Sequence, residues 1–498
     1  MSLRQREVST PIFLHISAVL VQIEPGSSRC PYRRGETLQT LIQPIDESRD
    51  FAAAELFFST TDTKGRIQRA NGVFQRISDY SWDELNNKPH NIVRHPDMPR
   101  IVFHLLWDHI QAGRPVVAYI KNLAHDGRFY WVVALVVAIP DGYLSVRFKP
   151  TSPLLATVKD LYAKLKAVEN GVEADSNDRR AAMAASGEAL ESALHALGFA
   201  DYDDFMQQVL KREMQSREAC LSFSSRPVVD ANPLHRPAGL DRPRTTAEVF
   251  DGLVEILNTL FGDLEVYIEI NGGVREKSEN VMEISESLRV SALNGVIAVD
   301  KMGNKASGLR PVLEWLRILS GEITQEGVRL SGSLNELVSD VDLVVFGLSA
   351  AKLQIEMTAQ FAHELVNRES AGGLGDTDAR MTEGAIRILH ESARETVRKA
   401  LVGLTSIRSR LKTLTESQTR LLDSSHSLRP IYLTGRIEMA EGAGALLATI
   451  FRDVGDQMEQ TVTNLKGLKD VLHDLDSHMV SGLAHGEQIE SVISQVRL

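Results

Sequence analysis

Apolar residues spaced alternately three and four apart dominate the second half of the chain, and this pattern constrains the fold more than any other feature. A first stripe runs through Ile386, Leu389, Ala393, Val397, Ala400, Leu404, Ile407, Leu411, Leu414 and Leu421. A second stripe runs through Phe451, Val454, Met458, Leu465, Leu468, Leu472, Leu475 and Met479. Such spacing is typical of helices that pair along a coiled-coil seam, because one helix cannot bury its own stripe. The pattern therefore predicts paired, antiparallel helical hairpins.

The first third of the chain has a different pattern, in which short β-rich segments alternate with helical ones. Residues 57–61 and 67–70 are predicted to form a hairpin, and residues 101–110 a helix. Three further strands follow, at residues 116–122, 129–134 and 143–148. A strand pair, then helices, then three antiparallel strands is the element order of a PAS domain. We therefore expect an α+β fold whose concave sheet face can hold a small cofactor.

Changes in pattern and composition divide the chain into regions. Residues 221–245 contain four prolines and interrupt two helical stretches, which is typical of a linker, and Gly372–Gly375 predicts a break between two helical blocks. The predicted regions are an irregular N-terminal extension (1–45), a sensor domain (46–150), a helical connector (151–220), the linker (221–245) and two helical regions (246–369 and 376–498).

Charge and cysteine content exclude several classes of function. The formal net charge of −11 argues against a nucleic-acid binder, because phosphate binding depends on clustered Lys and Arg. Cys30 and Cys220 alone cannot form a disulfide framework, so a reducing compartment, the cytoplasm, is expected. The longest apolar run, residues 132–139, is far shorter than the ~20 residues of a membrane-spanning helix, so no transmembrane segment is predicted.

Residues 88–99, KPHNIVRHPDMP, are the most distinctive local motif of the chain. They are preceded by Ser59–Asp62 and Ile77–Tyr80, and followed by Lys121–Asn122 and Gly142–Arg147. In this order and spacing the segments resemble the FAD-binding PAS domain of bacterial aerotaxis receptors, over about one fifth of the chain.

The resemblance implies a non-covalently bound FAD whose redox state reports oxygen or respiratory status. Positions required for FAD binding in that family correspond to Arg94, His95, Asp97, Asn71, Trp107 and Asn122. The residue types suit the ligand: FAD carries a pyrophosphate and a flat ring with a polar edge, so it needs a cation, amides and an aromatic wall. Arg94 would supply the charge and Trp107 the wall. The alternative is a cofactor-free PAS domain in which the Arg-His-Pro-Asp run is a loop with an internal ion pair.

Residues 284–303 are similar to the hairpin tip of chemoreceptors, although two charged contact positions differ. Ala298 stands where the family has glutamate, and Lys301 where it has arginine. A weaker copy at residues 427–442 keeps the glutamate as Glu438, which indicates duplication. The implied partners are a chemotaxis histidine kinase, its coupling protein or other receptors, but the changed contact residues put that contact in doubt. The alternative is that both copies only bury apolar seams.

Together these features predict a soluble PAS-domain signal transducer, expected as a homo-oligomer, that binds FAD to sense redox, oxygen or energy status. Its paired helices would relay that state to a chemotaxis-type or other signalling partner. The rival hypothesis is a cofactor-free PAS and coiled-coil interaction scaffold. An enzyme is not expected, because no nucleophile–base pair, metal-ligand cluster or phosphate loop is recognisable.

Overall fold

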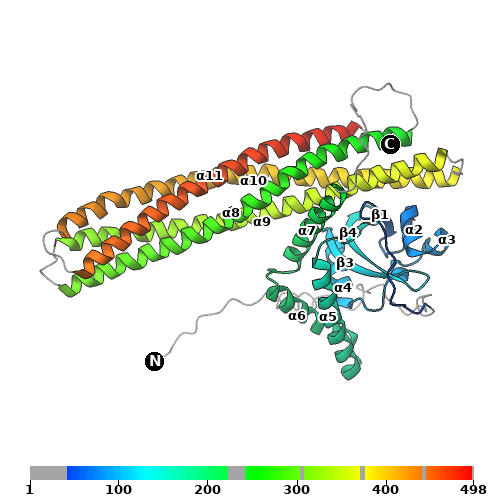
Figure 1. The fold of residues 1–498 in the computed structure, drawn as a ribbon, viewed down its shortest axis with the longest axis horizontal. Helices are drawn as coiled ribbons and strands as arrows, with labels where there is room; N and C mark the ends of the chain where they lie inside the picture. Colours follow the sequence, from blue (N-terminus) through cyan, green and yellow to red (C-terminus); the bar gives the residue numbers. More distant parts are fainter. Residues whose placement is uncertain (1–41, 223–241, 303–307, 371–375, 440–444, 496–498) are drawn as a thin grey trace, which may run out of the picture.

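The structure is a computed structural model that describes residues 42–222, 242–302, 308–370, 376–439 and 445–495 (Figure 1). Its first part is a five-stranded antiparallel sheet with strand order β2-β1-β5-β4-β3. The strands are β1 (Phe57–Asp62), β2 (Ile67–Ala70), β3 (Val116–Leu123), β4 (Phe129–Ile139) and β5 (Gly142–Phe148). The predicted α+β fold is confirmed, and β4 continues past its predicted end at residue 134.

Short helices between β2 and β3 cover one face of this sheet. They are α2 (Gly72–Ser78), α3 (Trp82–Leu85), the 3₁₀ helix η2 (His90–Val93) and α4 (Arg100–Gln111). The β1–β2 turn is fixed by Asp62, whose Oδ1 accepts hydrogen bonds from the backbone N–H groups of Lys64 and Arg66, both at 2.9 Å. Gly65 has a φ of +75° in this turn, a conformation that favours glycine.

Side chains alternate between the two faces of each strand, as extended backbone requires. On β1, Ser59 and Thr61 border a cavity on the concave face, whereas Phe58 lies on the outer face. On β5, Tyr143 and Arg147 likewise border the cavity. The same strands therefore carry both the cavity lining and the packing surface behind it.

Three helices follow the sheet: α5 (Leu154–Ser176), α6 (Arg179–Ala196) and α7 (Tyr202–Ser222). Helix α7 is anchored through the buried carboxylate of Glu213. This carboxylate accepts hydrogen bonds from the Tyr119 hydroxyl at 2.6 Å and from the backbone N–H groups of Thr151 and Ser152 at 2.7 and 3.1 Å. Because the carboxylate, the hydroxyl and the two N–H groups are all hydrogen-bonded, α7 is held firmly against β3 and the segment that follows β5.

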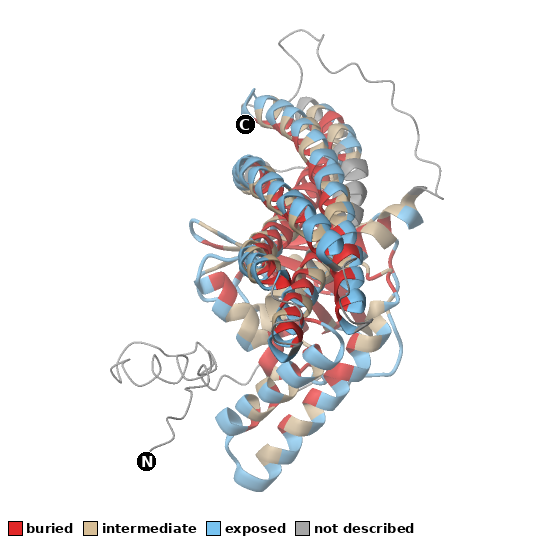
Figure 2. Ribbon diagram, turned by 90° about the vertical axis from the view of Figure 1, so that its left-hand side faces the viewer, coloured by how far each residue is buried: buried red, intermediate tan, exposed pale blue. Residues whose placement is uncertain are grey.

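Four long helices form a bundle in the rest of the described chain: α8 (Arg242–Met302), α9 (Leu309–Ser370), α10 (Asp376–Met439) and α11 (Ala445–Gln495). Each helix packs against two neighbours, in the cyclic order α8, α9, α10, α11. Buried residues face the inside of the bundle and exposed ones the outside (Figure 2). Every residue of the two apolar stripes is buried, so the predicted helical pairing is confirmed and occurs within one chain.

The two tip-like sequences lie at the same end of the bundle (Figure 1). There Asp300 of α8 pairs with Arg310 of α9 at 2.7 Å, and Gly308 lies beside the carboxylate of Glu438 in α10. The turns at residues 303–307 and 440–444 are outside the described residues. The predicted break at Gly372–Gly375 is outside them too.

The five-stranded sheet packs on α9 near the other end of the bundle. The ring of Phe58 on β1 meets that of Phe361 edge-on, with centroids 4.9 Å apart. The backbone N–H of Leu56 donates to Gln360 Oε1 at 3.1 Å, and that of Gly72 to Glu364 Oε1 at 2.9 Å. Helix α9 thus belongs to two cores, one with the sheet and one with the other bundle helices.

A buried ion pair reinforces this junction. Arg217 of α7 donates from Nη1 to Glu356 Oε2 of α9 at 2.6 Å, and from Nε to the carbonyl of Ala53 at 3.0 Å. The Arg217 side chain is 1% exposed and that of Glu356 is 7% exposed. Lys352, one turn away on α9, lies 3.9 Å from Glu356 and 2.7 Å from Glu218.

Parts of the predicted organisation lie outside what the structure describes. Residues 1–41 and 223–241 hold most of the predicted extension and linker, and they are not described. Helix α8 begins at Arg242, inside the range predicted as linker. Within the described ranges, no helix is both long enough and apolar enough to cross a bilayer.

Candidate functional site

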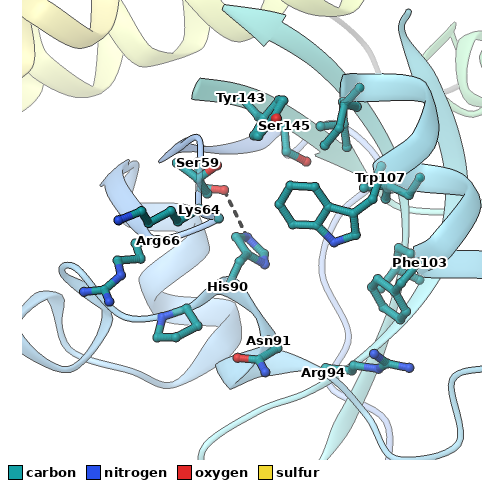
Figure 3. A pocket seen from close by; sticks show the side chains of 18 of the residues that line it. Ser59, Lys64, Arg66, His90, Asn91, Arg94, Phe103, Trp107, Tyr143 and Ser145 are labelled. Atoms are coloured by element: carbon teal, nitrogen blue, oxygen red, sulfur yellow. Dashed lines mark hydrogen bonds between the residues drawn. The ribbon is translucent and has the colours of Figure 1, made fainter. Parts of the chain in front are cut away.

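A cavity of about 550 Å³ lies between the concave face of the sheet, helix α4 and the η2 segment (Figure 3). This volume is in the range of small-molecule sites. The lining comes from β1, the β1–β2 turn, η2, α4, β3, β4 and β5, with one residue from α6. The lining includes Ser59, Lys64, Gly65, Arg66, His90, Asn91, Arg94, Phe103, Trp107, Asn122, Tyr143, Arg147 and Arg179.

The lining is strongly cationic although the whole chain is acidic. Among the described residues, the lining contains Lys64, Arg66, Arg94, Arg147 and Arg179, and no Asp or Glu. A concave, partly apolar site with charge of one sign focuses the electrostatic potential and attracts ligands of the opposite sign. The cavity is therefore suited to an anionic ligand.

Aromatic side chains from α4 form one wall of the cavity. Figure 3 shows the indole of Trp107 between His90 and Phe103. The indole meets the Tyr143 ring edge-on, with centroids 5.5 Å apart, and a Cβ at Gly65 would approach it to 3.1 Å. Glycine in the β1–β2 turn thus allows the turn to pack closely on Trp107. A flat ring could stack against this wall.

A buried guanidinium lies at the sheet side of the cavity. Arg147 of β5 is 3% exposed, and its Nη2 donates to Ser59 Oγ at 2.7 Å and to His90 Nε2 at 2.5 Å. Its cation also lies 5.0 Å from the centroid of the Phe74 ring. Burial lowers the pKa of Arg147 to about 10, so the group remains positively charged at neutral pH.

His90 is neutral in this arrangement. Burial and the neighbouring Arg147 charge lower the pKa of His90 to about 3. Because a guanidinium can only donate, Nε2 of His90 must be the accepting nitrogen. The ring borders the cavity and stacks on Phe74, with centroids 5.8 Å apart and planes 7° apart.

Three of the six residues predicted to bind the cofactor line the cavity, namely Arg94, Trp107 and Asn122. The Arg94 guanidinium lies 4.0 Å from the centroid of the Phe103 ring and donates to the carbonyl of Met98 at 3.3 Å. Arg94 and Asn122 are also joined by a backbone bridge between the loop and β3. These contacts bring a cation, an amide and the aromatic wall to one cavity.

Asn71 is not among the lining residues, because its side chain is used within the fold. Its Oδ1 accepts hydrogen bonds from the backbone N–H groups of Phe58 and Phe74, at 3.2 and 3.4 Å. Its Nδ2 donates to the carbonyl of Leu56 at 3.2 Å. Asn71 therefore starts helix α2 and fixes it to β1.

His95 and Asp97 also lie outside the lining, in the loop that leads to α4. His95 Nδ1 accepts a hydrogen bond from the Asp97 backbone N–H at 3.2 Å, and Asp97 Oδ2 pairs with Lys121 Nζ at 2.6 Å. Burial and the Lys121 ammonium lower the pKa of His95 to about 4. Partial burial would raise the pKa of Asp97, but the hydrogen bond from Lys121 and the nearby His95 outweigh it and lower that pKa. These residues fix the loop that carries Arg94.

Sequence reasoning missed Arg147, His90 and Ser59 as members of the site. One usable signal was the period of two on β5, which places Tyr143, Ser145 and Arg147 on one face of an otherwise apolar strand. A charged residue at an inward position of a buried strand needs a partner or a ligand. The contact with His90 could not be read, because it joins residues 57 positions apart.

Comparison with known proteins agrees with this architecture. Residues 67–145 match the family model of the PAS fold, so this part of the chain is a PAS domain. Over 114 residues, 22% of this chain, the sequence is 40% identical to the aerotaxis receptor of Escherichia coli strain K12. The chain therefore spans about a fifth (22%) of the length of that curated relative. The resemblance read from residues 88–99 and their flanking segments is confirmed for the PAS region.

Two solved structures also match part of this chain. A PAS domain of a protein from Colwellia psychrerythraea is 22% identical, with a TM-score of 0.17, over 19% of this chain and 85% of that one. The light-state structure of the blue-light photoreceptor Aureochrome1 LOV is 24% identical, with a TM-score of 0.19, over 20% of this chain and 85% of that one.

Proposed function

We propose that this chain is a sensor that holds FAD in the PAS cavity and relays the cofactor's redox state through the helix bundle to a signalling partner. The observation that carries the proposal is the cavity itself, whose lining, within the part of the chain that the structure describes, combines five cations, no carboxylate and an aromatic wall. The pyrophosphate of a dinucleotide such as FAD would suit the cationic lining, and its flat ring would suit the aromatic wall. The similarity of the PAS region to an aerotaxis receptor supports a signalling role tied to oxygen or energy status.

Each predicted residue has a role in this proposal. Arg94 provides positive charge, Trp107 the stacking wall and Asn122 an amide at the polar edge of the ring. Asn71, His95 and Asp97 act by fixing α2 and the loop before α4, so their loss would disturb the cavity without removing a direct contact. When bound, FAD supplies reversible electron transfer, and the surrounding charges and hydrogen bonds set its potential.

The far end of the bundle is the proposed contact for a chemotaxis-type kinase, its coupling protein or another receptor. Several large apolar side chains are exposed there, with Ile437 69%, Trp315 65% and Leu446 64% accessible. Exposed apolar groups that cluster in one place mark interaction sites. Both tip-like sequences reach this end, so a partner would meet two similar hairpins of one chain. Homo-oligomerisation and a cytoplasmic location remain predictions, and light scattering on the purified chain measures the first.

An absorbance spectrum of the purified full chain, before and after incubation with FAD, tests the cofactor. We expect the bands of oxidised flavin, and we expect Trp107→Ala and Arg94→Gln to lose them. Trp315→Ala is the matched control, because this tryptophan lies on the bundle, far from the cavity, and its loss should leave the colour intact. Wild-type protein that stays colourless after incubation would leave the cofactor-free scaffold as the better hypothesis.

A pull-down with the chemotaxis coupling protein and kinase tests the partner. Ile437→Asp places a charge on the exposed apolar end and should abolish capture. Val402→Asp is the control, since Val402 is 60% exposed but lies midway along α10. Equal capture of both variants would contradict binding at this end.

A further inference from the structure

The most unusual group in the PAS domain is the buried cation of Arg147. Among the described residues its hydrogen-bond partners are the neutral Ser59 hydroxyl and the neutral His90 ring, and no carboxylate pairs with it. Its second terminal nitrogen, Nη1, is buried and has no hydrogen-bond partner. Burying a charge without a counter-charge is strongly unfavourable, so such a group persists where a ligand makes use of it.

The surroundings of Arg147 orient it toward a ligand. His90 and Ser59 both accept from Nη2, and this fixes the plane of the guanidinium beside the cavity. Phe57 and Phe74 lie against it, with the cation 5.7 and 5.0 Å from their ring centroids. Neither Nη1 nor Nε has a hydrogen-bond partner among the described residues, and the rings beside the guanidinium make a setting too apolar for a hydrated phosphate.

A second lining residue points the same way. Asn91 follows His90 in η2, and its Oδ1 is buried without a hydrogen-bond partner. The lining thus holds one unsatisfied donor, on the residue hydrogen-bonded to His90, and one unsatisfied acceptor, on the residue that follows His90 in the chain. Buried polar groups are normally satisfied, so two orphans in one cavity lining indicate missing partners.

We infer that Arg147 is the anchor for the polar edge of the bound ring: its guanidinium, which borders the cavity, donates to a ring carbonyl oxygen. This inference rests on the proposed function, since it takes a flavin as the ring. It assigns Arg147 to the ring and not to the pyrophosphate. This role of Arg147 follows independently of the residues in the Arg94 loop.

The first test measures dissociation constants for FAD and for riboflavin, by quenching of flavin fluorescence, on the full chain stripped of ligand. Riboflavin has the same ring and no phosphate. Arg147→Met should weaken both ligands by the same factor, about 10- to 100-fold, as expected for one charge-assisted hydrogen bond. Arg128→Met is the control, because Arg128 pairs with Asp126 outside the cavity, and it should change neither constant.

Two results of this test would overturn the inference. If Arg147→Met leaves both constants within twofold of wild type, Arg147 does not contact the ligand. If FAD is weakened and riboflavin is not, the guanidinium meets the phosphates and not the ring.

The second test needs no flavin and separates this inference from the proposed function. Removing an uncompensated charge should leave the melting temperature of the ligand-free chain unchanged or higher in Arg147→Met, because Ser59 Oγ lies 3.1 Å from His90 Nε2 and can donate to it instead. A clear drop would show that Arg147 is a structural residue and would overturn the inference. If wild-type protein binds neither flavin, the proposed function fails. The melting comparison still decides whether the Arg147 charge stabilises the ligand-free fold or is a binding group for a different ligand.

Discussion

The Arg217–Glu356 ion pair gives the sharpest test of how the PAS domain is held on the bundle. Both side chains are almost fully buried, and the 2.6 Å contact joins α7 to α9. Removing one member of such a pair leaves an uncompensated charge, which typically costs about 3–5 kcal/mol. Glu356→Gln and Arg217→Met should therefore each lower the free energy of unfolding by about this amount.

The double variant Arg217→Met, Glu356→Met should behave differently. This variant leaves neither charge of the pair buried. It still loses two contacts of the wild type: the hydrogen bond to the Ala53 carbonyl, worth about 1 kcal/mol, and the weak attraction between Glu356 and Lys352 at 3.9 Å. Lys352 keeps Glu218 at 2.7 Å. We expect the double variant to lie within about 2 kcal/mol of wild type, well above either single variant.

Urea unfolding followed by far-UV circular dichroism measures these differences. Glu395→Gln is a suitable control, because its pair with Arg398 is about half exposed on both sides and should be worth less than about 1 kcal/mol. The reasoning is refuted if the single variants lose less than about 1 kcal/mol, or if the double variant loses the sum of both.

Three further predictions concern packing and pH. Gly435→Ala should destabilise the bundle by about 1–3 kcal/mol, because its Cβ would clash with the Phe451 ring. Gly332→Ala meets nothing within 4 Å among the described residues and should be neutral or stabilising; thermal melting compares the two variants. Phe361→Ala should cost about 3–5 kcal/mol in urea titrations while the flavin bands persist, because it removes the ring behind Phe58 and nothing from the cavity; loss of the bands would contradict this separation. Burial is the main reason that the pKa of His90 is lowered to about 3 and that of His95 to about 4. The native state therefore binds fewer protons than the unfolded state between about pH 6.5 and pH 4. Stability should therefore fall as the pH drops through that window, by up to about 1.4 kcal/mol per pH unit for each histidine, and the fall should be shallower in His90→Gln.

Local periodicity is what made the fold predictable. The spacing of Leu404, Ile407 and Leu411 is set by neighbouring residues, and the structure buries all three along the predicted stripe. The strand predicted at residues 57–61 is equally local, and it forms β1. The position of the PAS domain on α9 was not predictable in this way. The hydrogen bond from Leu56 to Gln360 joins residues 304 positions apart, and an apolar residue such as Phe361 looks the same whether it faces a bundle or a sheet.

The candidate site was only partly predictable, for a related reason. A motif marks positions on which binding depends, and it does not separate side chains that touch a ligand from those that hold the fold. Arg94 and Trp107 line the cavity, whereas both polar atoms of the Asn71 side chain form hydrogen bonds within the fold, to the backbone of Phe58 and Leu56. Arg147 is missed because its role depends on His90, from a different element, being a neutral acceptor.

Strand β1 connects the cavity to the bundle through the alternation of its side chains. Ser59 faces the cavity and contacts Arg147, and the preceding residue, Phe58, faces Phe361. Because the interior is close-packed, a displacement of β1 at Ser59 also moves the Phe58 ring against α9. From Phe361 to the start of α9 at Leu309 the helix is continuous, a distance of about 80 Å at 1.5 Å per residue. Under the proposed function, a change of charge in the cavity would pass through Ser59 and Phe58 to α9, and along this continuous helix to the end that carries the exposed Trp315.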